Sequence, residues 1–180
     1  MEAVRMHMTK NGDEITIRPA EPEDSCEIID TIRSSAMERS YVLMEQYGKE
    51  IASEIGYISA LDRLKNLLIV AAVGVEVIGC LAALQADGGK REETAHVLHV
   101  GLHLKETYRG LGIGSQMLAY AIAWAQEVGF KKLEASIFTT NKRSIKLFSN
   151  AGFTEEGIRH HRIRIGAEYV DEVLMGKILE

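Results

Sequence analysis

The stretch VLHVGLHLKETYRGLGIGS, residues 97–115, decides how this chain folds. It reads as an apolar strand, then a glycine-rich turn over residues 108–114, then the start of a long helix. The first N–H groups of a helix have no partner within it, and that end of the helix carries a partial positive charge. The turn is therefore predicted to bind an anion.

Four residues of the turn favour a phosphate as that anion. Glycines lack the Cβ atoms that would hold a phosphate away from the backbone, and an arginine offers a guanidinium suited to phosphate oxygens. These residues are Arg109, Gly110, Gly112 and Gly114.

Length and composition indicate one globular domain over residues 1–180, with residues 1–13 as a loosely ordered extension. The chain is 46% hydrophobic and 26% charged, which is enough to form its own core. No apolar run reaches the roughly 18 residues of a membrane helix, and the polar N-terminus does not resemble a secretory signal, so we expect a cytoplasmic protein. Cys26 and Cys80 are isolated and indicate neither a disulfide framework nor a zinc site.

The charge is distributed unevenly along the chain. The net charge is −5, which argues against nucleic-acid binding. Residues 1–60 hold 6 basic and 12 acidic side chains (−6), whereas residues 101–180 hold 11 and 9 (+2). An anionic ligand therefore suits the C-terminal half, and the acidic N-terminal half either faces solvent or favours a cationic co-substrate.

Hydrophobic periodicity predicts a mixed sheet with helices on its faces. The expected strands are 14–18, 67–73, 76–84, 97–104, 132–138, 158–165 and 168–174. The expected helices begin near Pro22, lie between Tyr47 and Lys65, cover 113–128, and begin at Asn141. In the second helix the apolar stripe is expected to be Ile51, Ile55, Ile58, Leu61 and Leu64, and Trp124 is expected to pack in the core.

The spacing of the glycine turn separates it from other phosphate loops. A dinucleotide fingerprint fails because Ser115 follows Gly114, and no Gly-Lys-Ser/Thr of a P-loop is present. The turn does match Arg/Gln-x-x-Gly-x-Gly/Ala. A second motif, NKRSIKLF at 141–148, is followed by NAGF at 150–153. With these two motifs and its order of elements, the chain resembles the GNAT superfamily of N-acetyltransferases.

The resemblance implies an acetyl-CoA-dependent acyltransferase of α/β fold. Its mixed, mostly antiparallel sheet would have about seven strands and four helices, and its fourth and fifth strands would splay around pantetheine. Backbone groups of the fourth strand would pair with the pantetheine amides, and one N–H, assigned to Leu104, would polarise the thioester carbonyl. The implied cofactor-binding residues are Leu102, His103, Leu104, Arg109, Gly110, Leu111, Gly112, Ile113, Gly114, Ser115, Asn141, Ser144 and Phe148. Lys142, Arg143 and Lys146 either attract the nucleotide phosphates or face solvent.

The acid and base of the reaction depart from the family pattern. Phe148 replaces the tyrosine suggested as general acid, so another group protonates the thiolate, or the thiolate leaves unassisted with a model-thiol pKa of about 8.5. His99 stands where the family often has a basic carboxylate, and strand alternation puts it on the same face as His103. Either histidine serves as the base, or both are buried, hydrogen-bonded packing residues. We expect no metal, because no Cys, Asp or Glu in this strand completes a ligand set.

The acceptor is predicted to be a small-molecule amine, with the family's variable segments as walls of its site. Glu38 and Tyr41 are the expected substrate-binding residues, although Glu38 could equally be solvated. His160, His161 and Arg162 either form another wall or an exposed strand edge.

The tail of the chain resembles the amino-acid and phosphinothricin branch. The alternatives are an acetyltransferase of protein N-termini or polyamines, and an acyl-CoA-binding module with little turnover. A homodimer is possible because it is common in the family.

Overall fold

The computed structural model describes residues 4–38 and 50–180. Among them it places eight strands and four α-helices. The strands are β1 (Arg5–Met8), β2 (Glu14–Pro19), β3 (Leu67–Val73), β4 (Glu76–Gln85), β5 (Val97–Leu104), β6 (Lys132–Phe138), β7 (Thr154–Ile165) and β8 (Glu168–Ile178). The helices are α1 (Ser25–Met37), α2 (Ile51–Ser59), α3 (Ile113–Val128) and α4 (Lys142–Asn150).

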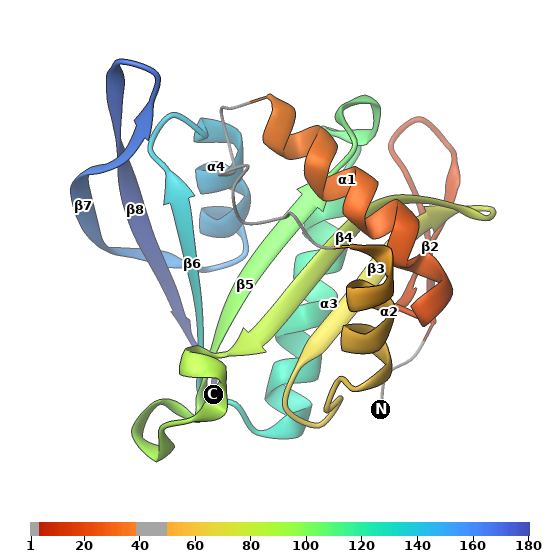
Figure 1. Ribbon diagram of the computed structural model, residues 1–180, viewed down its shortest axis with the longest axis horizontal. Coiled ribbons are helices and arrows are strands. Elements are labelled where there is room, and N and C mark those ends of the chain that lie inside the picture. Colours follow the sequence, from red (N-terminus) through yellow and green to blue (C-terminus); the bar gives the residue numbers. More distant parts are fainter. Residues whose placement is uncertain (1–3, 39–49) are drawn as a thin grey trace.

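All eight strands form one sheet, in the order β1-β2-β3-β4-β5-β6-β8-β7. Every neighbouring pair is antiparallel except β5 and β6, which run parallel (Figure 1). The mixed sheet is confirmed, with one strand more than the seven expected. The additional strand, β1, lies in the segment expected to be loosely ordered; it pairs with β2, and the Arg5 guanidinium lies 4.5 Å from the centre of the Tyr120 ring.

Two layers of helices cover the sheet. The helices α1 and α2 lie on the near face in Figure 1, and α3 lies behind it. The larger core cluster contains the apolar face of α3, together with Phe148 from α4. Trp124 is buried there and stacks on Phe130 with 5.9 Å between ring centres, as expected for a packing residue. The smaller cluster joins α1 and α2 to the opposite face of β3 and β4.

The second helix is shorter than its apolar stripe predicted. It ends at Ser59, and Ile58 and Glu54 are buried whereas Ile51 and Ile55 are exposed. Asp62 organises a turn directly after the helix, accepting the Leu64 N–H through its side chain and two later N–H groups through its carbonyl. The helix itself is capped at Ala60, and Leu64 is left exposed in the turn at Asp62 that follows.

Candidate functional site

The parallel pairing of β5 with β6 is the feature that creates the site. Only three residue pairs join these strands, from Val97↔Lys132 to His99↔Glu134. Beyond His99 the strands diverge (Figure 1), and β4 and β8 continue on their outer edges. The divergence leaves a cleft of about 700 Å³, lined by β5, β6, the glycine turn and α4.

The register of β5 shows which backbone groups face this cleft. Lys105 N–H donates to the Ile78 carbonyl at 3.0 Å, and hydrogen-bonded pairs in an antiparallel ladder recur at every second residue. The backbones of His103 and Gly101 are therefore turned toward β4, and those of Leu102 and Leu104 toward the cleft. This supports backbone recognition at Leu102 and Leu104 but not at His103, which differs from the sequence-based expectation.

The glycines of the turn have two different structural roles. Gly110 and Gly112 have φ angles of 81° and 91°, which favour glycine. The N–H groups of Ser115 and Gln116 donate to the Gly112 carbonyl, which is the first acceptor of the helix. The N–H groups that come earlier in the turn have no acceptor within the helix, and they border the cleft. Gly114 has an ordinary helical φ, and a Cβ there would approach Leu102 and Leu147 to 3.2 Å. The missing side chain of Gly114 thus permits close packing of the helix, and Gly114 also lines the cleft.

The side chains of Leu111 and Ile113 do not line the cleft. Ile113 is fully buried in the core, and Leu111 packs against the same cluster. Any contribution of these two residues to binding has to come from their backbone N–H groups.

The guanidinium of Arg109 is held by protein groups and is not directed at a phosphate site. Its two terminal nitrogens donate to the Glu38 carboxylate at 2.7 and 2.6 Å, and its Nε donates to the Leu104 carbonyl at 3.0 Å. The hydrogen bonds from Arg109 hold the pKa of Glu38 below its usual value. In this structure the two side chains bind each other, and a role of Arg109 toward phosphate and of Glu38 toward a substrate ammonium stays a prediction. Together they brace the end of α1 against the end of β5.

Lys10 is the cation that the sequence analysis missed at the turn. It lies between β1 and β2, and its N–H donates to the Leu111 carbonyl at 3.3 Å. A Cβ on Gly112 would lie 3.9 Å from the Lys10 Cε, and Lys10 lines the cleft. Its ammonium is therefore placed at the N-terminus of α3, where a phosphate would be bound.

Replacement of this lysine tests the placement of the phosphates. We expect Lys10→Ala to raise KM for acetyl-CoA about tenfold with little change in kcat, because one charge-assisted contact to the bound nucleotide is lost. Steady-state kinetics measure both values. Lys90→Ala, which removes an exposed lysine that does not line the cleft, is the matched control. Equal KM values for the two variants would contradict the placement.

The α4 side of the cleft contains the second motif. The Asn141 side chain caps α4 by accepting the Ser144 N–H at 3.0 Å, so its oxygen is engaged and only its amide nitrogen is directed elsewhere. Phe148 is buried, meets Phe153 edge to face at 4.9 Å and lines the cleft. Arg143 also lines the cleft, whereas Lys142 and Lys146 are not among the described lining residues.

The two candidate histidines lie at different depths along β5. His99 belongs to the last pair with β6, is 55% exposed, and places its Nδ1 3.6 Å from Glu134. It does not line the cleft, and four residues of strand separate it from His103 by roughly 13 Å. This position outside the cleft lining does not support the predicted role of His99 as the base.

His103 does line the cleft. It pairs with Cys80, which belongs to the cluster under α1 and α2, so its side chain points to that face of the sheet. Burial, and secondarily the charge of Arg109, lowers the pKa of His103 to about 4. Its imidazole is consequently neutral at physiological pH.

Four polar side chains also line the cleft: Ser35 of α1, His103 of β5, Arg162 of β7 and Glu172 of β8. We call the part of the lining that they form the acceptor end. Ser35, Ser136 and Glu172 were not found from the sequence, because only the packing of distant elements brings them together. Tyr41, the other expected substrate-binding residue, lies outside the described residues.

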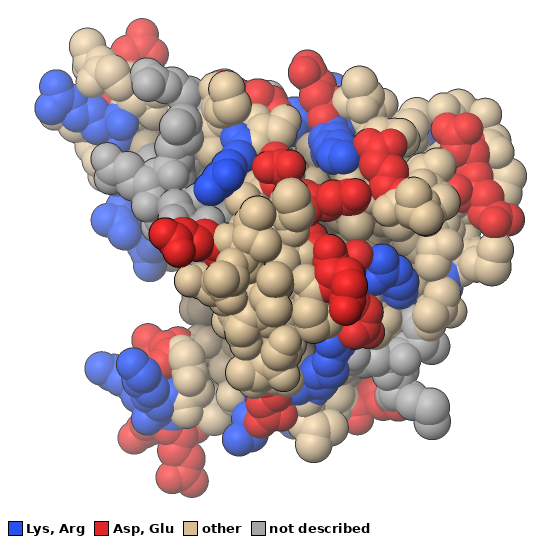
Figure 2. Space-filling view, turned by 45° about the vertical axis from the view of Figure 1, so that its right-hand side comes forward, with Lys and Arg blue, Asp and Glu red and all other residues tan. Residues whose placement is uncertain are grey.

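Cationic side chains predominate in the cleft. Its described lining residues include Lys10, Arg143 and Arg162, together with Arg109, whose charge is paired with Glu38, but only one acidic residue, Glu172. Elsewhere, on the face that Figure 2 brings forward, acidic and basic side chains are interspersed. The cleft is therefore suited to an anionic ligand, as the charge distribution along the sequence suggested.

The described residues, 4–38 and 50–180, show no feature of a membrane-spanning helix or of a metal site. None of the described helices combines the length and apolar character needed to cross a membrane. Within the same ranges, no three His, Cys, Asp or Glu side chains are grouped as metal ligands.

Comparison with known proteins identifies the family. Residues 30–153 match the model of the acetyltransferase (GNAT) family, so the chain belongs to this family. The predicted superfamily, its acyltransferase class and its α/β fold are thereby confirmed.

Two curated relatives and one solved structure are similar to the chain. A "Putative phosphinothricin acetyltransferase" of Bacillus subtilis is 35% identical over 80 residues, 44% of this chain and 49% of the relative. The chain thus aligns with about half of that protein's length. An L-amino acid N-acetyltransferase of Escherichia coli is 26% identical over 65% of this chain and 71% of its own. The structure of a phosphinothricin acetyltransferase of Sinorhizobium meliloti, solved in complex with acetyl-CoA, has a TM-score of 0.81 and 22% sequence identity. The match covers 92% of this chain and 88% of that chain.

Proposed function

We propose that this protein transfers an acetyl group from acetyl-CoA to the primary amine of a small molecule such as an amino acid. The observation that carries the proposal is the cleft between β5 and β6, which connects the glycine turn to the polar acceptor end. The names of the relatives support the same chemistry. A cytoplasmic location and a homodimer remain predictions from the sequence.

The residues of the cleft fit acetyl-CoA. The turn at Gly110 and Gly112, with Lys10 beside it, would hold the pyrophosphate. Cleft-facing backbone groups of Leu102 and the N–H of Leu104 would pair with the pantetheine arm, and Phe148 would pack against it. When bound, acetyl-CoA supplies a thioester whose C–S bond breaks as the C–N bond to the amine forms.

In the proposed reaction the protein mainly positions the amine and the thioester, and it supplies no strong general acid or base. Neutral His103 can accept a hydrogen bond from the incoming amine and so direct its lone pair, but its low pKa makes it a poor final acceptor for the proton. Water then takes that proton. Phe148 has no proton to donate, so departure of the thiolate depends on its own low basicity and on water. The Leu104 N–H is the donor that would stabilise developing negative charge on the carbonyl oxygen.

A thiol-release assay tests the proposed reaction. With acetyl-CoA and a panel of L-amino acids, amino-acid amides, polyamines and short peptides, we expect saturable, acceptor-dependent release with the amino acids. Release with peptides or polyamines alone would indicate the corresponding alternative enzyme. Calorimetric binding of acetyl-CoA without release by any acceptor would indicate a binding module and overturn the proposed function.

A further inference from the structure

The β7–β8 hairpin contains an irregularity beside the acceptor end. Regular pairing stops at Arg159↔Glu172 and resumes at Ile163↔Val170, so three residues of β7, 160–162, face the single residue Asp171. Within this bulge His161 has a φ angle of 51°, a left-handed conformation that is unusual for a residue other than glycine. Such strain persists only where the surrounding contacts enforce it.

Asp171 supplies those contacts. Its Oδ1 accepts the His161 N–H at 2.7 Å, and its Oδ2 lies 2.8 Å from His160 Nδ1. These two hydrogen bonds lower the pKa of Asp171, the first contributing most. Its carbonyl accepts the Thr139 N–H at 2.9 Å, which ties it to the end of β6. The His161 ring stacks on Tyr169 with 5.1 Å between centres, which holds the bulge from the outside.

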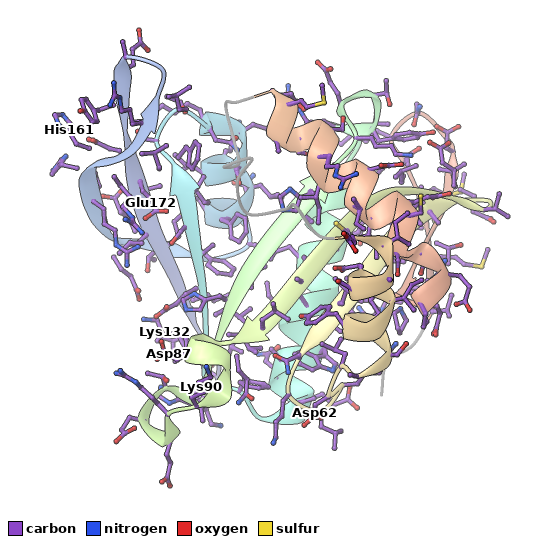
Figure 3. The ribbon with its side chains drawn as sticks, in the orientation of Figure 1. Asp62, Asp87, Lys90, Lys132, His161 and Glu172 are labelled. Carbon is purple, nitrogen blue, oxygen red and sulfur yellow. The ribbon has the colours of Figure 1, made fainter. Side chains whose placement is uncertain are left out.

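The bulge determines where Arg162 lies. In Figure 3, His161 lies at the outer edge of the hairpin, and Glu172 lies nearer the body of the sheet. Arg162, the next residue after His161, lines the cleft together with Glu172. The shift in register thus delivers a guanidinium to the acceptor end.

The guanidinium of Arg162 is only weakly engaged. Glu172 is bound by Arg159 at 3.0 Å, whereas Arg162 Nε is 3.8 Å from the same oxygen, beyond hydrogen-bond distance. The side chain of Arg162 is 60% exposed. Because Glu172 is already bound by Arg159, the Arg162 guanidinium keeps donors that suit an oxyanion.

A second observation at the acceptor end also indicates a polar ligand. The Ser35 hydroxyl borders the same cleft, is buried to 4% exposure, and has no hydrogen-bond partner among the described residues. A buried hydroxyl of this kind is normally satisfied by protein, water or ligand.

We propose that Arg162 is the specificity-determining residue of the acceptor end, where it binds a carboxylate on the amine acceptor, and that Asp171 is the positioning residue that holds it there. The inference rests on the proposed function for the identity of the reaction. It adds a requirement on the acceptor: the amine has to carry an anionic group.

Paired acceptors test the requirement for a carboxylate. Each L-amino acid is compared with its amide, which keeps the amine and removes the charge. For the wild type we expect a KM at least tenfold lower for the acid. Arg162→Gln should remove this preference by raising KM for the acid about tenfold, with KM for acetyl-CoA unchanged. Arg164→Gln, a neighbouring β7 arginine that does not line the cleft, is the matched control and should behave as wild type.

A double-mutant cycle tests the positioning role of Asp171. Asp171→Ala should raise KM for the acid about as much as Arg162→Gln does, and it should have no further effect when Arg162 is already Gln. Asp171→Asn keeps an oxygen for the His161 N–H and should retain the wild-type preference. Two results would overturn the positioning role. One is that the increases in KM for the acid caused by Asp171→Ala and Arg162→Gln add up in the double variant. The other is that Asp171→Asn loses the preference for the acid although its thermal stability is unchanged.

A binding measurement separates this inference from the proposed reaction. Calorimetry of the same acid and amide pairs, with CoA present, should show at least tenfold weaker binding of the acid to Arg162→Gln. If the wild type releases no thiol but shows this difference, the proposed reaction fails and the role of Arg162 stands. If acid and amide bind the wild type equally, the role of Arg162 is wrong, whatever the turnover.

Discussion

Replacing Gly101 with valine is expected to reduce thiol release at least about 100-fold, a loss of roughly 2.7 kcal/mol of transition-state stabilisation, while leaving the protein folded. Gly101 lies in the middle of β5, and its partner Ala82 packs with the cluster beneath α1 and α2. A side chain at Gly101 would therefore project on the same face as His103. A Cβ there would meet no atom within 4 Å, and the backbone is not left-handed. The new methyl groups would occupy the space where the amine has to approach.

The same substitution should not weaken the fold. Valine fits a strand better than glycine and restricts the unfolded chain more, so the midpoint of thermal unfolding should stay constant or rise. Gly101→Ala should show an intermediate loss of activity. Gly157→Val is the matched control, because Gly157 lies in β7, has open space around its Cβ position and does not line the cleft. Wild-type kinetics for Gly101→Val would show that the reaction takes place elsewhere.

His103 is expected to make the protein less stable as the pH falls below neutrality. Its folded pKa of about 4 lies below the usual 6.5, so above pH 6.5 it is neutral in both states and contributes no pH dependence. As the pH falls through 6.5, the unfolded chain binds a proton that the folded chain binds only near pH 4. At pH 4.5 this difference corresponds to about 2.5 kcal/mol of lost stability.

Urea unfolding of the wild type and of His103→Gln at pH 7 and pH 4.5 measures this effect. The wild type should lose about 2.5 kcal/mol more than the variant between the two values, because glutamine does not titrate. An NMR titration of the His103 ring in the folded protein checks the pKa directly. The explanation fails if both proteins lose the same stability, or if the ring titrates near pH 6.5.

Local patterns in the sequence were sufficient to predict most of the fold. The glycine turn, the following helix and the capping Asn141 depend on neighbours within a few residues, and each is found where it was predicted. The second helix was predicted too long, because the apolar spacing continued to Leu64, past Ala60, where the helix is capped, and into the turn at Asp62. The additional strand β1 was missed because its stability depends on pairing with β2 and on Tyr120 far along the chain.

The roles within the site were harder to predict because they depend on distant contacts. Arg109 has the residue type of a phosphate ligand, yet it pairs with Glu38, which is 71 residues away. Nothing near Lys10 in the sequence indicates the turn at Gly112, where it is placed by β1 and β2. Alternation correctly put His99 and His103 on one face of β5, but it does not show where β5 separates from β6.

The short parallel seam between β5 and β6 has a mechanical consequence. Among the described residues, five antiparallel strands lie on one side of it and three on the other, and the ladder between the two groups is three residue pairs long. Past that seam the described parts of β5 and β6 share no further residue pairs. The cleft between them is therefore expected to widen and narrow around a bulky thioester without breaking the ladders of either group. Because the described strands form one sheet, admission of substrate is expected to bend that sheet at the β5–β6 pairing.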